Sequence, residues 1–301
     1  MKKIIVIIGP TGSKKSTLAH LIAKNINGEI INADVFQMYK EINIGINKPS
    51  IEMQNEIKYH LINNLSIKDK YSIFNYQIDF DKKYDEIIKN HKIPIMCGGS
   101  HLYIDCIVKG YKLDHDKIQE EYNKLNNWTI QELEEYLKIN DYKSYSKFKN
   151  NLQRLKRSVA LLKVNNNQRK EILEKENNCA KYKSLIIMTS KDRKIIYEEI
   201  NKRAISFVQN DWKNEVINLI TKYSNELKDF QAMKAIGYNE IYDSIIENRP
   251  IDIQKIQQKT RHLVKHQLTW CKNKFDNKIL FNFGIDNFDL LLSKIKDFWY
   301  D

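Results

Sequence analysis

The amino-acid sequence predicts an α/β fold with a mostly parallel sheet and an inserted helical domain. Early in the chain, short apolar runs alternate with helical patterns, as expected for parallel strands joined by helices. Between about residues 113 and 183 the strand signal almost disappears, and Glu, Lys and Asn become dense. We therefore expect an α/β core with C-terminal helices, formed by residues 1–112 and 184–301, and a helical insertion at 113–183.

Five apolar runs are the expected strands. They are Ile4–Ile8, Glu29–Asn32, Tyr59–Asn63, Ile93–Cys97 and Ser184–Met188. Each is short, rich in residues that favour strands, and followed by polar residues or glycine. Periodic apolar residues predict helices at Thr17–Ala23, Thr129–Ile139, Leu152–Val164, Asp192–Tyr223 and Ile253–Phe275.

The loop after the first strand has the spacing of a phosphate-binding loop. Lys15 and Ser16 stand at its end, where the signature has a lysine and a hydroxyl residue. Such a loop binds phosphate with backbone N–H groups, a helix N-terminus and an ammonium, and its hydroxyl binds Mg²⁺. The expected core is therefore P-loop NTPase-like. The candidate diphosphate- or nucleotide-binding residues are Gly9, Pro10, Thr11, Gly12, Ser13, Lys14, Lys15 and Ser16.

Lys14 stands where the signature has its second glycine. Glycine tolerates a positive φ and lets the backbone approach a phosphate without a Cβ in the way. Lys14 must therefore accept strain or place its own ammonium beside the anion. We interpret the loop as weakened.

Two strands end in residues that can do chemistry. Asp34 follows the second strand, and Gly98-Gly99-Ser100 follows the fourth. Open α/β sheets bind ligands at the carboxyl ends of their strands. Asp34 could exchange protons there or cap the next helix. Ser100 could hydrogen-bond a ligand or cap a helix.

Length and composition bound the class of protein. A chain of 301 residues with 42% hydrophobic content can bury a sizeable core. No apolar stretch reaches the roughly 20 residues of a membrane span, and the N-terminus has no signal-peptide pattern. We expect a cytoplasmic monomer without a membrane or an obligate protein partner. The scattered cysteines, expected to be reduced thiols, are Cys97, Cys106, Cys179 and Cys271.

The formal net charge of +12 fits a polyanionic partner such as nucleic acid, although abundant Lys, Asn and Ile also suggest compositional drift. Arg154 and Arg157 lie on adjacent turns of one expected helix and suit phosphates or an unstacked base. A second basic stripe contains Lys255, Lys259, His262 and His266. It could hold RNA or be an ordinary solvated helix surface. A metal site at the two histidines lacks a third ligand.

Together these segments resemble the tRNA dimethylallyltransferases, also called tRNA isopentenyltransferases. The likeness spans nearly the whole chain in order. The segments that carry it are Gly9–Ser16, Asp34–Tyr39, Gly98–Tyr103, Gln153–Ser158, Lys234–Glu240 and Thr260–Trp270. A phosphate-binding loop alone would be generic, whereas this series is specific.

The resemblance implies transfer of a dimethylallyl group from dimethylallyl diphosphate to N6 of the adenosine 3′-adjacent to the anticodon, position 37. Asp34 would accept the proton of the amine, Ser100 would orient the amine or the diphosphate, and Lys15 would stabilise the leaving group. Mg²⁺ would bind near Ser16. The residues implied in binding the tRNA anticodon stem-loop are Asp34, Val35, Phe36, Gln37, Gln153, Arg154, Leu155, Lys156, Arg157, Arg261 and Lys265.

The chain departs from the family pattern at several positions. Lys14, His101, Val35, His266 and Glu199 replace two glycines, a serine and two arginines respectively. Enough of the pattern remains to predict a working, divergent enzyme.

Three other functions stay open at this point. An adenylate isopentenyltransferase acting on free AMP or ATP shares the core, but the basic insertion and C-terminal helix favour tRNA. A catalytically weakened RNA-binding relative would explain Lys14. A nucleotide kinase would need a second acidic strand end for magnesium, and the strand Ile93–Cys97 ends in Gly-Gly instead.

Overall fold

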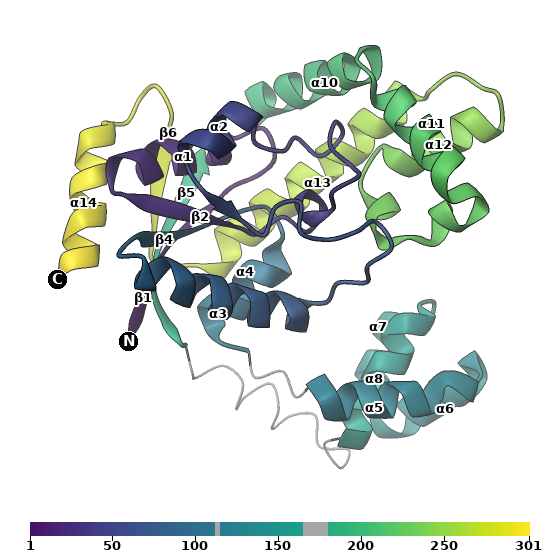
Figure 1. The fold of residues 1–301 in the computed structure, drawn as a ribbon. Helices are drawn as coiled ribbons and strands as arrows, with labels where there is room; N and C mark the ends of the chain where they lie inside the picture. Colours follow the sequence, from purple (N-terminus) through teal and green to yellow (C-terminus); the bar gives the residue numbers. More distant parts are fainter. Residues whose placement is uncertain (112–114, 165–179) are drawn as a thin grey trace. The chain divides into compact units, whose positions relative to one another are not determined.

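The computed structural model describes residues 1–111, 115–164 and 180–301 (Figure 1). The chain divides into two compact units, Met1–Val108 with Tyr182–Asp301, and Lys109–Lys181. The first expected boundary, at 112–113, lies outside the described residues. The second, at 183–184, falls inside the strand that begins at Tyr182.

The first unit contains a parallel sheet in the order β3-β2-β4-β1-β5-β6, and every described strand pair in it is parallel. The strands are β1 (Lys2–Ile8), β2 (Gly28–Asn32), β3 (Tyr59–His60), β4 (Ile93–Cys97), β5 (Tyr182–Ser190) and β6 (Lys278–Asn282). This confirms the predicted fold class, a mostly parallel α/β sheet.

Helices connect the strands and extend beyond the sheet (Figure 1). They are α1 (Lys15–Asn25), α2 (Ile51–Glu56), α3 (Ile73–Lys89), α4 (His101–Lys109), α10 (Arg193–Gln209), α11 (Trp212–Tyr223), α12 (Tyr238–Ile246), α13 (Ile253–Lys274) and α14 (Phe288–Tyr300). A short 3₁₀ helix, Val35–Met38, follows β2.

The central strand β1 is buried on both faces. Ile4, Val6 and Ile8 belong to one core cluster, which also takes side chains from α3, α4 and α13. Ile5 and Ile7 belong to a second cluster, with side chains from α1 and α14. Because successive strand residues point to opposite faces, the unbroken apolar run of β1 is what a doubly covered parallel strand requires.

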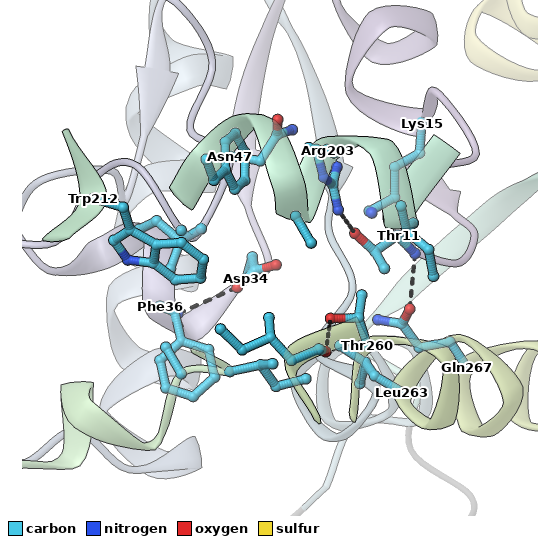
Figure 2. Close-up of a pocket in the computed structure, with 18 residues that line it drawn as sticks. Thr11, Lys15, Asp34, Phe36, Asn47, Arg203, Trp212, Thr260, Leu263 and Gln267 are labelled. Atoms are coloured by element: carbon cyan, nitrogen blue, oxygen red, sulfur yellow. Dashed lines mark hydrogen bonds between the residues drawn. The ribbon is translucent and has the colours of Figure 1, made fainter. Parts of the chain in front are cut away.

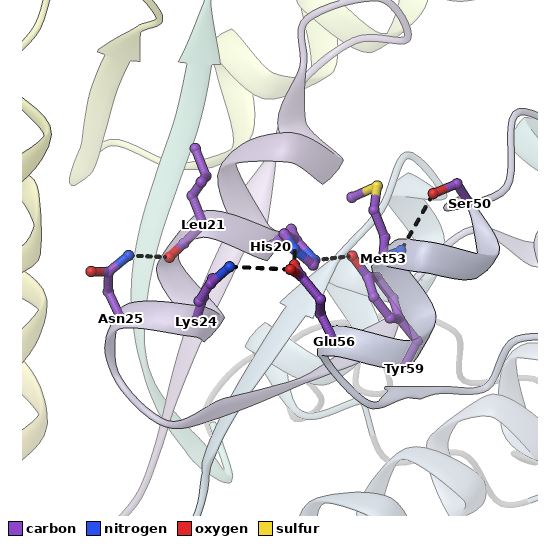
Figure 3. Close-up of polar contacts among 8 residues, drawn as sticks. All are labelled: His20, Leu21, Lys24, Asn25, Ser50, Met53, Glu56 and Tyr59. Atoms are coloured by element: carbon purple, nitrogen blue, oxygen red, sulfur yellow. Dashed lines mark hydrogen bonds and ion pairs between the residues drawn. The ribbon is translucent and has the colours of Figure 1, made fainter.

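A polar cluster joins α1 to the segment that contains α2 and β3 (Figure 3). The ring of His20 places Nε2 2.8 Å from Glu56 Oε2 and Nδ1 3.1 Å from the hydroxyl of Tyr59. Lys24 adds an ion pair to Glu56 at 3.2 Å. These contacts hold α2 against the helix that follows the glycine-rich loop.

The second unit is helical. Its described helices are α5 (His115–Lys124), α6 (Ile130–Asn140), α7 (Tyr142–Phe148) and α8 (Leu152–Val164). Thr129 caps α6 through a reciprocal capping box with Glu132. The unit has its own apolar core, to which Leu133, Leu137 and Leu155 contribute.

Several expected elements need correction. The run Tyr59–Asn63 is a strand only at Tyr59–His60, because Leu61 and Asn63 have φ of 58° and 53° and leave the strand. The predicted helix Asp192–Tyr223 is two helices, α10 and α11, separated at Asn210–Asp211. Strand β6 was not predicted from the sequence.

The described cysteines Cys97, Cys106 and Cys271 are buried and free, as expected. Cys179 lies outside the described residues. Among the helices that the structure describes, none has the length and apolar character needed to cross a membrane.

Candidate functional site

The glycine-rich loop Gly9–Ser16 connects β1 to α1. Its turn is closed by Ser13, whose backbone N–H and hydroxyl both donate to Pro10 O, at 3.2 and 2.7 Å. The Ser13 hydroxyl also lies 2.6 Å from the hydroxyl of Thr189, at the end of β5. A Cβ on Gly9 would lie 2.1 Å from Thr189 Oγ1, so the close approach of β5 requires glycine there.

Lys14 has the left-handed backbone conformation that the missing glycine would adopt, with φ 63° and ψ 21°. This conformation costs a residue with a Cβ roughly 1–2 kcal/mol. Its side chain is exposed and lines a cavity with Lys15 and Ser16. The structure thus shows both features that the substitution implied, an unfavourable backbone and a cation beside the loop. Whether the loop is weakened remains a prediction.

A pocket beside the loop gathers residues from distant parts of the first unit (Figure 2). Lys15 comes from the start of α1, Asp34 from the end of β2, and Gln267 from α13. Four further polar residues line the same pocket: Thr11, Asn47, Arg203 and Thr260. Its apolar wall is formed by Phe36, Ile46, Ile200, Ala204, Phe207, Trp212, Ala235, Ile236, Ile256 and Leu263.

Lys15 and Asp34 influence each other in this pocket. Burial raises the pKa of the Asp34 carboxyl, and Lys15 opposes the rise. Burial lowers the pKa of the Lys15 ammonium, and Cys97 and Asp34 oppose this change. Asp34 also caps the following 3₁₀ helix, because its Oδ1 accepts from the backbone N–H of Phe36 at 3.2 Å. The capping and the chemical interpretations of Asp34 are therefore compatible.

Ser100 is fixed to the same strand end. Its hydroxyl accepts from the backbone N–H of Val35 at 3.1 Å, and its own backbone N–H donates to Ala33 O at 2.9 Å. The backbone at Gly98 lies so close to the end of β2 that a Cβ on Gly98 would lie 2.1 Å from Ala33 O. A hydroxyl that accepts one hydrogen bond can still donate another. The structure thus brings Ser100 next to the segment that carries Asp34.

Arg203 and Gln267 are polar residues of the pocket that were not singled out from the sequence. Arg203 donates from Nη2 to Thr11 Oγ1 at 2.8 Å, and burial lowers the pKa of its guanidinium. Gln267 is buried, accepts from the backbone N–H of Thr11 at 2.8 Å and donates to Gly99 O at 3.2 Å. Gln267 lies inside the segment Thr260–Trp270 that carried the resemblance, whereas Arg203 has no local signal.

The candidate tRNA-binding residues of the first unit fall in two places. Val35, Phe36 and Gln37 belong to the 3₁₀ helix after Asp34. Phe36 lines the pocket, and Gln37 donates from Nε2 to Asn47 O at 3.0 Å. On α13, Arg261 donates to Asn201 Oδ1 at 2.9 Å and is partly buried, and Lys265 is exposed.

The other candidate tRNA-binding residues lie on α8 of the second unit. Gln153, Arg154 and Arg157 are exposed, and Lys156 is partly buried with its ammonium 4.6 Å from the centre of the Tyr122 ring. The expected contact of Leu155 with tRNA must be corrected. Its side chain is fully buried in the core of this unit, so it supports the helix and is not available to touch RNA.

Two residues that differ from the family pattern, His101 and Glu199, contact neighbouring side chains. His101 stacks on Trp270, with ring centroids 4.2 Å apart and planes at 4°, and burial lowers the pKa of His101 to about 4. Its ring is therefore neutral at ordinary pH. Glu199 forms an ion pair with Lys191. Each of these two side chains therefore has a favourable contact in the structure.

Comparison with known proteins decides the family. Residues 37–274 match the family model described as IPP transferase. A tRNA dimethylallyltransferase of Malacoplasma penetrans is 41% identical over 304 residues, covering 100% of this chain and 99% of the relative. The chain belongs to the tRNA dimethylallyltransferase family. It is therefore a transferase, and the resemblance seen in its motifs is confirmed.

Solved structures agree with this family. A tRNA isopentenylpyrophosphate transferase from Bacillus halodurans superimposes with a TM-score of 0.71 and 26% identity, covering 100% of this chain and 96% of that one. A eukaryotic dimethylallyltransferase acting on tRNA has a TM-score of 0.87 at 21% identity, covering 100% of this chain and 80% of that one. The second likeness concerns the fold alone.

Proposed function

We propose that this protein transfers the dimethylallyl group of dimethylallyl diphosphate to N6 of adenosine 37 in tRNA. The observation that carries the proposal is the shared pocket of Lys15 and Asp34. It places a cation from a phosphate-loop motif beside a carboxylate whose pKa burial raises. Such a pair suits a reaction in which an anion departs and a proton is removed.

The leaving group would be bound by the glycine-rich loop. When the bond between the allylic carbon and the diphosphate oxygen breaks, negative charge develops on that oxygen. Lys15 and Arg203 supply positive charge at the polar end of the pocket, and Lys14 lines the cavity beside it. Preorganised donors of this kind stabilise a developing anion more than water does, because they need no reorganisation.

Asp34 would accept the proton of the adenine amine while nitrogen bonds to the allylic carbon. The raised pKa makes its carboxylate a stronger base, and Lys15 favours the ionised form. Proton transfer by a positioned side chain contributes roughly 10²–10⁴ in rate. Ser100, held by Val35, would orient the amine through its hydroxyl hydrogen.

The residues at the loop fit Mg²⁺. Ser16, Thr17 and Asp34 present oxygens around one cavity. Groups of three or more His, Cys, Asp or Glu that could hold a metal are not found among the described residues. Mg²⁺ commonly keeps several waters and binds through substrate phosphates and few protein oxygens, so no such group is needed. When bound at Ser16, the ion would neutralise charge on the diphosphate.

The apolar wall of the pocket suits the other reacting groups. Phe36 and Trp212 present aromatic rings, and Leu263 and Ile200 present aliphatic surface. A dimethylallyl chain and an adenine ring both gain from such surface, and the adenine must leave its stack to reach Asp34. The 3₁₀ helix, the exposed cations of α8, and Arg261 and Lys265 of α13 would bind the anticodon stem-loop. A substrate of this kind fits the expected cytoplasmic location.

A comparison of two kinds of acceptor in parallel reactions tests the proposal. Purified protein with Mg²⁺ and dimethylallyl diphosphate is offered an anticodon stem-loop with consecutive adenosines, and in parallel AMP or ATP, with products read by mass spectrometry. We expect prenylated RNA. Prenylated nucleotide would instead indicate an adenylate isopentenyltransferase, and tight RNA binding without any product would indicate a catalytically weakened relative.

A further inference from the structure

One wall of the reaction pocket, the pocket that contains Asp34, is formed by residues 43–47, the wall loop. Gly45, Ile46 and Asn47 line this pocket. Ile46 and Asn47 also line the cavity beside the glycine-rich loop. A displacement of the wall loop would therefore change the surroundings of the reacting groups.

The first half of the wall loop is held by α11 and α12. Glu215 of α11 accepts from the backbone N–H groups of Asn43 and Ile44, at 3.0 and 3.3 Å. The hydroxyl of Tyr238, the first residue of α12, accepts from the N–H of Gly45 at 3.3 Å. The same hydroxyl donates to Glu215 Oε1 at 2.6 Å. Three consecutive backbone donors of the loop thus have partners on these two helices.

The second half is held by the 3₁₀ helix that follows Asp34. Gln37 donates from Nε2 to Ile46 O and Asn47 O, at 3.3 and 3.0 Å. The wall loop and the helix that Asp34 caps are therefore joined through one side chain.

Lys48 follows the wall loop directly and connects it to two other segments. Its Nζ donates to Tyr39 O at 2.5 Å, to Asn43 Oδ1 at 2.8 Å and to Asn63 Oδ1 at 2.6 Å. These three acceptors match the three N–H groups of a lysine ammonium. Hydrogen bonds from an ionised donor are roughly twice as strong as neutral ones.

The charge of Lys48 is retained although its side chain is half-buried. Burial lowers the pKa of Lys48 to about 8, and Glu215 and Glu41 oppose the fall. The ammonium is therefore the main form at pH 7. Lys48 lines neither the reaction pocket nor the cavity beside the glycine-rich loop, so its bonds hold the protein and not the substrate.

We propose that Lys48 is a positioning residue of the reaction pocket. Its ammonium fixes the wall loop and also the end of the 3₁₀ helix, because Tyr39 is the C-cap of that helix and Asp34 is its N-cap. Without the ammonium, Asp34 and the wall opposite it lose a common support. Its effect on dimethylallyl transfer rests on the proposed function, in which a misplacement of about 1 Å can cost roughly 10² in rate.

The first test compares single-turnover transfer by Lys48→Met with transfer by Lys40→Met. Methionine keeps an unbranched side chain and removes the ammonium. Lys40 is an exposed lysine of the same segment, so its variant is the matched control. With saturating dimethylallyl diphosphate and anticodon stem-loop, we expect transfer to be about 10- to 100-fold slower in Lys48→Met and unchanged in the control. The affinity for inorganic pyrophosphate, measured by calorimetry, should be the same in both.

Backbone hydrogen exchange distinguishes positioning from a general loss of stability. In Lys48→Met we expect residues 41–50 to exchange about tenfold faster than in the control, because the wall loop opens more often. Exchange in β4, which lies in the centre of the sheet, should be the same in the two variants.

Equal exchange of residues 41–50 in the two variants would overturn the inference, and so would faster exchange in β4 to the same extent. Weaker pyrophosphate binding in Lys48→Met alone would overturn it too, by making Lys48 part of the phosphate site. Where the unchanged protein prenylates the RNA, equal transfer rates in the two variants would have the same meaning. If the unchanged protein never prenylates the RNA, the proposed function fails, whereas faster exchange confined to residues 41–50 still supports the role of Lys48.

Discussion

Lys15 and Asp34 line one pocket, and each opposes the effect of burial on the pKa of the other. Neither residue is near the other in the sequence. The parallel order of β2, β4 and β1 brings their two loops to the same edge of the sheet. The proposed chemistry depends on this pairing, because one group would bind the leaving anion and the other would remove the proton.

Replacing Asp34 with Asn separates its two roles. The Asn side chain keeps an oxygen that can accept from the backbone N–H of Phe36, so the 3₁₀ helix is retained. We expect single-turnover transfer to slow by roughly 10²–10⁴. RNA affinity, measured by fluorescence anisotropy, should change little. A large loss of RNA binding in the Asn variant would make Asp34 a recognition residue.

The pH dependence follows from the direction of the Asp34 pKa shift. Its carboxyl is a base only when ionised, and burial raises its pKa above the ordinary value of 3.8. Transfer should therefore decline as the pH falls through that raised pKa. Lys15 lowers the pKa of Asp34, so the residual activity of Lys15→Gln should decline at a higher pH than that of the unchanged protein. A pH–rate profile that does not move would refute the coupling.

Lys14→Gly tests the glycine-rich loop. Glycine adopts the observed φ of 63° without the steric cost of a Cβ. The free energy of unfolding, measured by thermal unfolding, should therefore rise by about 1 kcal/mol. We also expect tighter binding of dimethylallyl diphosphate, as the weakened-loop interpretation requires. Lys14→Asn is the matched control, because Asn tolerates this backbone but carries no charge. If both variants bind the diphosphate more weakly, the Lys14 ammonium is a phosphate ligand.

Arg203 should contribute to binding of the diphosphate. Its guanidinium donates to Thr11 Oγ1 at 2.8 Å. Arg203 lines both the pocket with Asp34 and the cavity that Lys14 and Ser16 line. Arg203→Gln should weaken dimethylallyl diphosphate binding about tenfold or more, in line with hydrogen bonds to charged groups. Binding is measured by calorimetric titration. Arg193→Gln is the control, because Arg193 lies on the same helix but does not line the pocket that contains Asp34. Equal affinities in the two variants would exclude the proposed role.

Leu155 and Arg157 should respond differently to truncation. Leu155→Ala leaves a cavity in the core of the second unit and should cost about 2–5 kcal/mol in its unfolding free energy. Arg157 is exposed on the same helix, so Arg157→Ala should leave that free energy nearly unchanged and weaken stem-loop binding. Denaturant unfolding and RNA titration of both variants measure the difference. Normal stability in Leu155→Ala would contradict the observed packing.

The sequence predicted the parts of the fold that are encoded locally. The runs Ile4–Ile8 in β1 and Ile93–Cys97 in β4 are continuously apolar, because both faces of these strands are covered. β6 escaped prediction because it is a short strand at the edge of the sheet, with Leu280 57% exposed, and lacks the pattern of a buried strand. The run that ends at Asn63 was overextended, since a left-handed residue such as Leu61 has no signature in apolar content.

The same contrast holds for the site. Lys15, Ser16 and Asp34 could be found from the sequence because a loop signature and a strand end mark them. Arg203 lies far along the chain on α10 and reaches Thr11 only through tertiary packing, so no local pattern reveals it. Leu155 shows the reverse limit, because a motif that resembles an RNA-binding segment also contains the residue that packs its helix.

N6 of one adenosine is the proposed acceptor of the dimethylallyl group. The most direct test offers two anticodon stem-loops that differ only at the nucleotide 3′ of the anticodon, adenosine in one and purine riboside, which lacks the exocyclic amine, in the other. With isotopically labelled dimethylallyl diphosphate and Mg²⁺, we predict labelled N6-dimethylallyladenosine from the first RNA and no labelled nucleoside from the second. Equal labelling of both RNAs, or labelling of neither, would contradict the account.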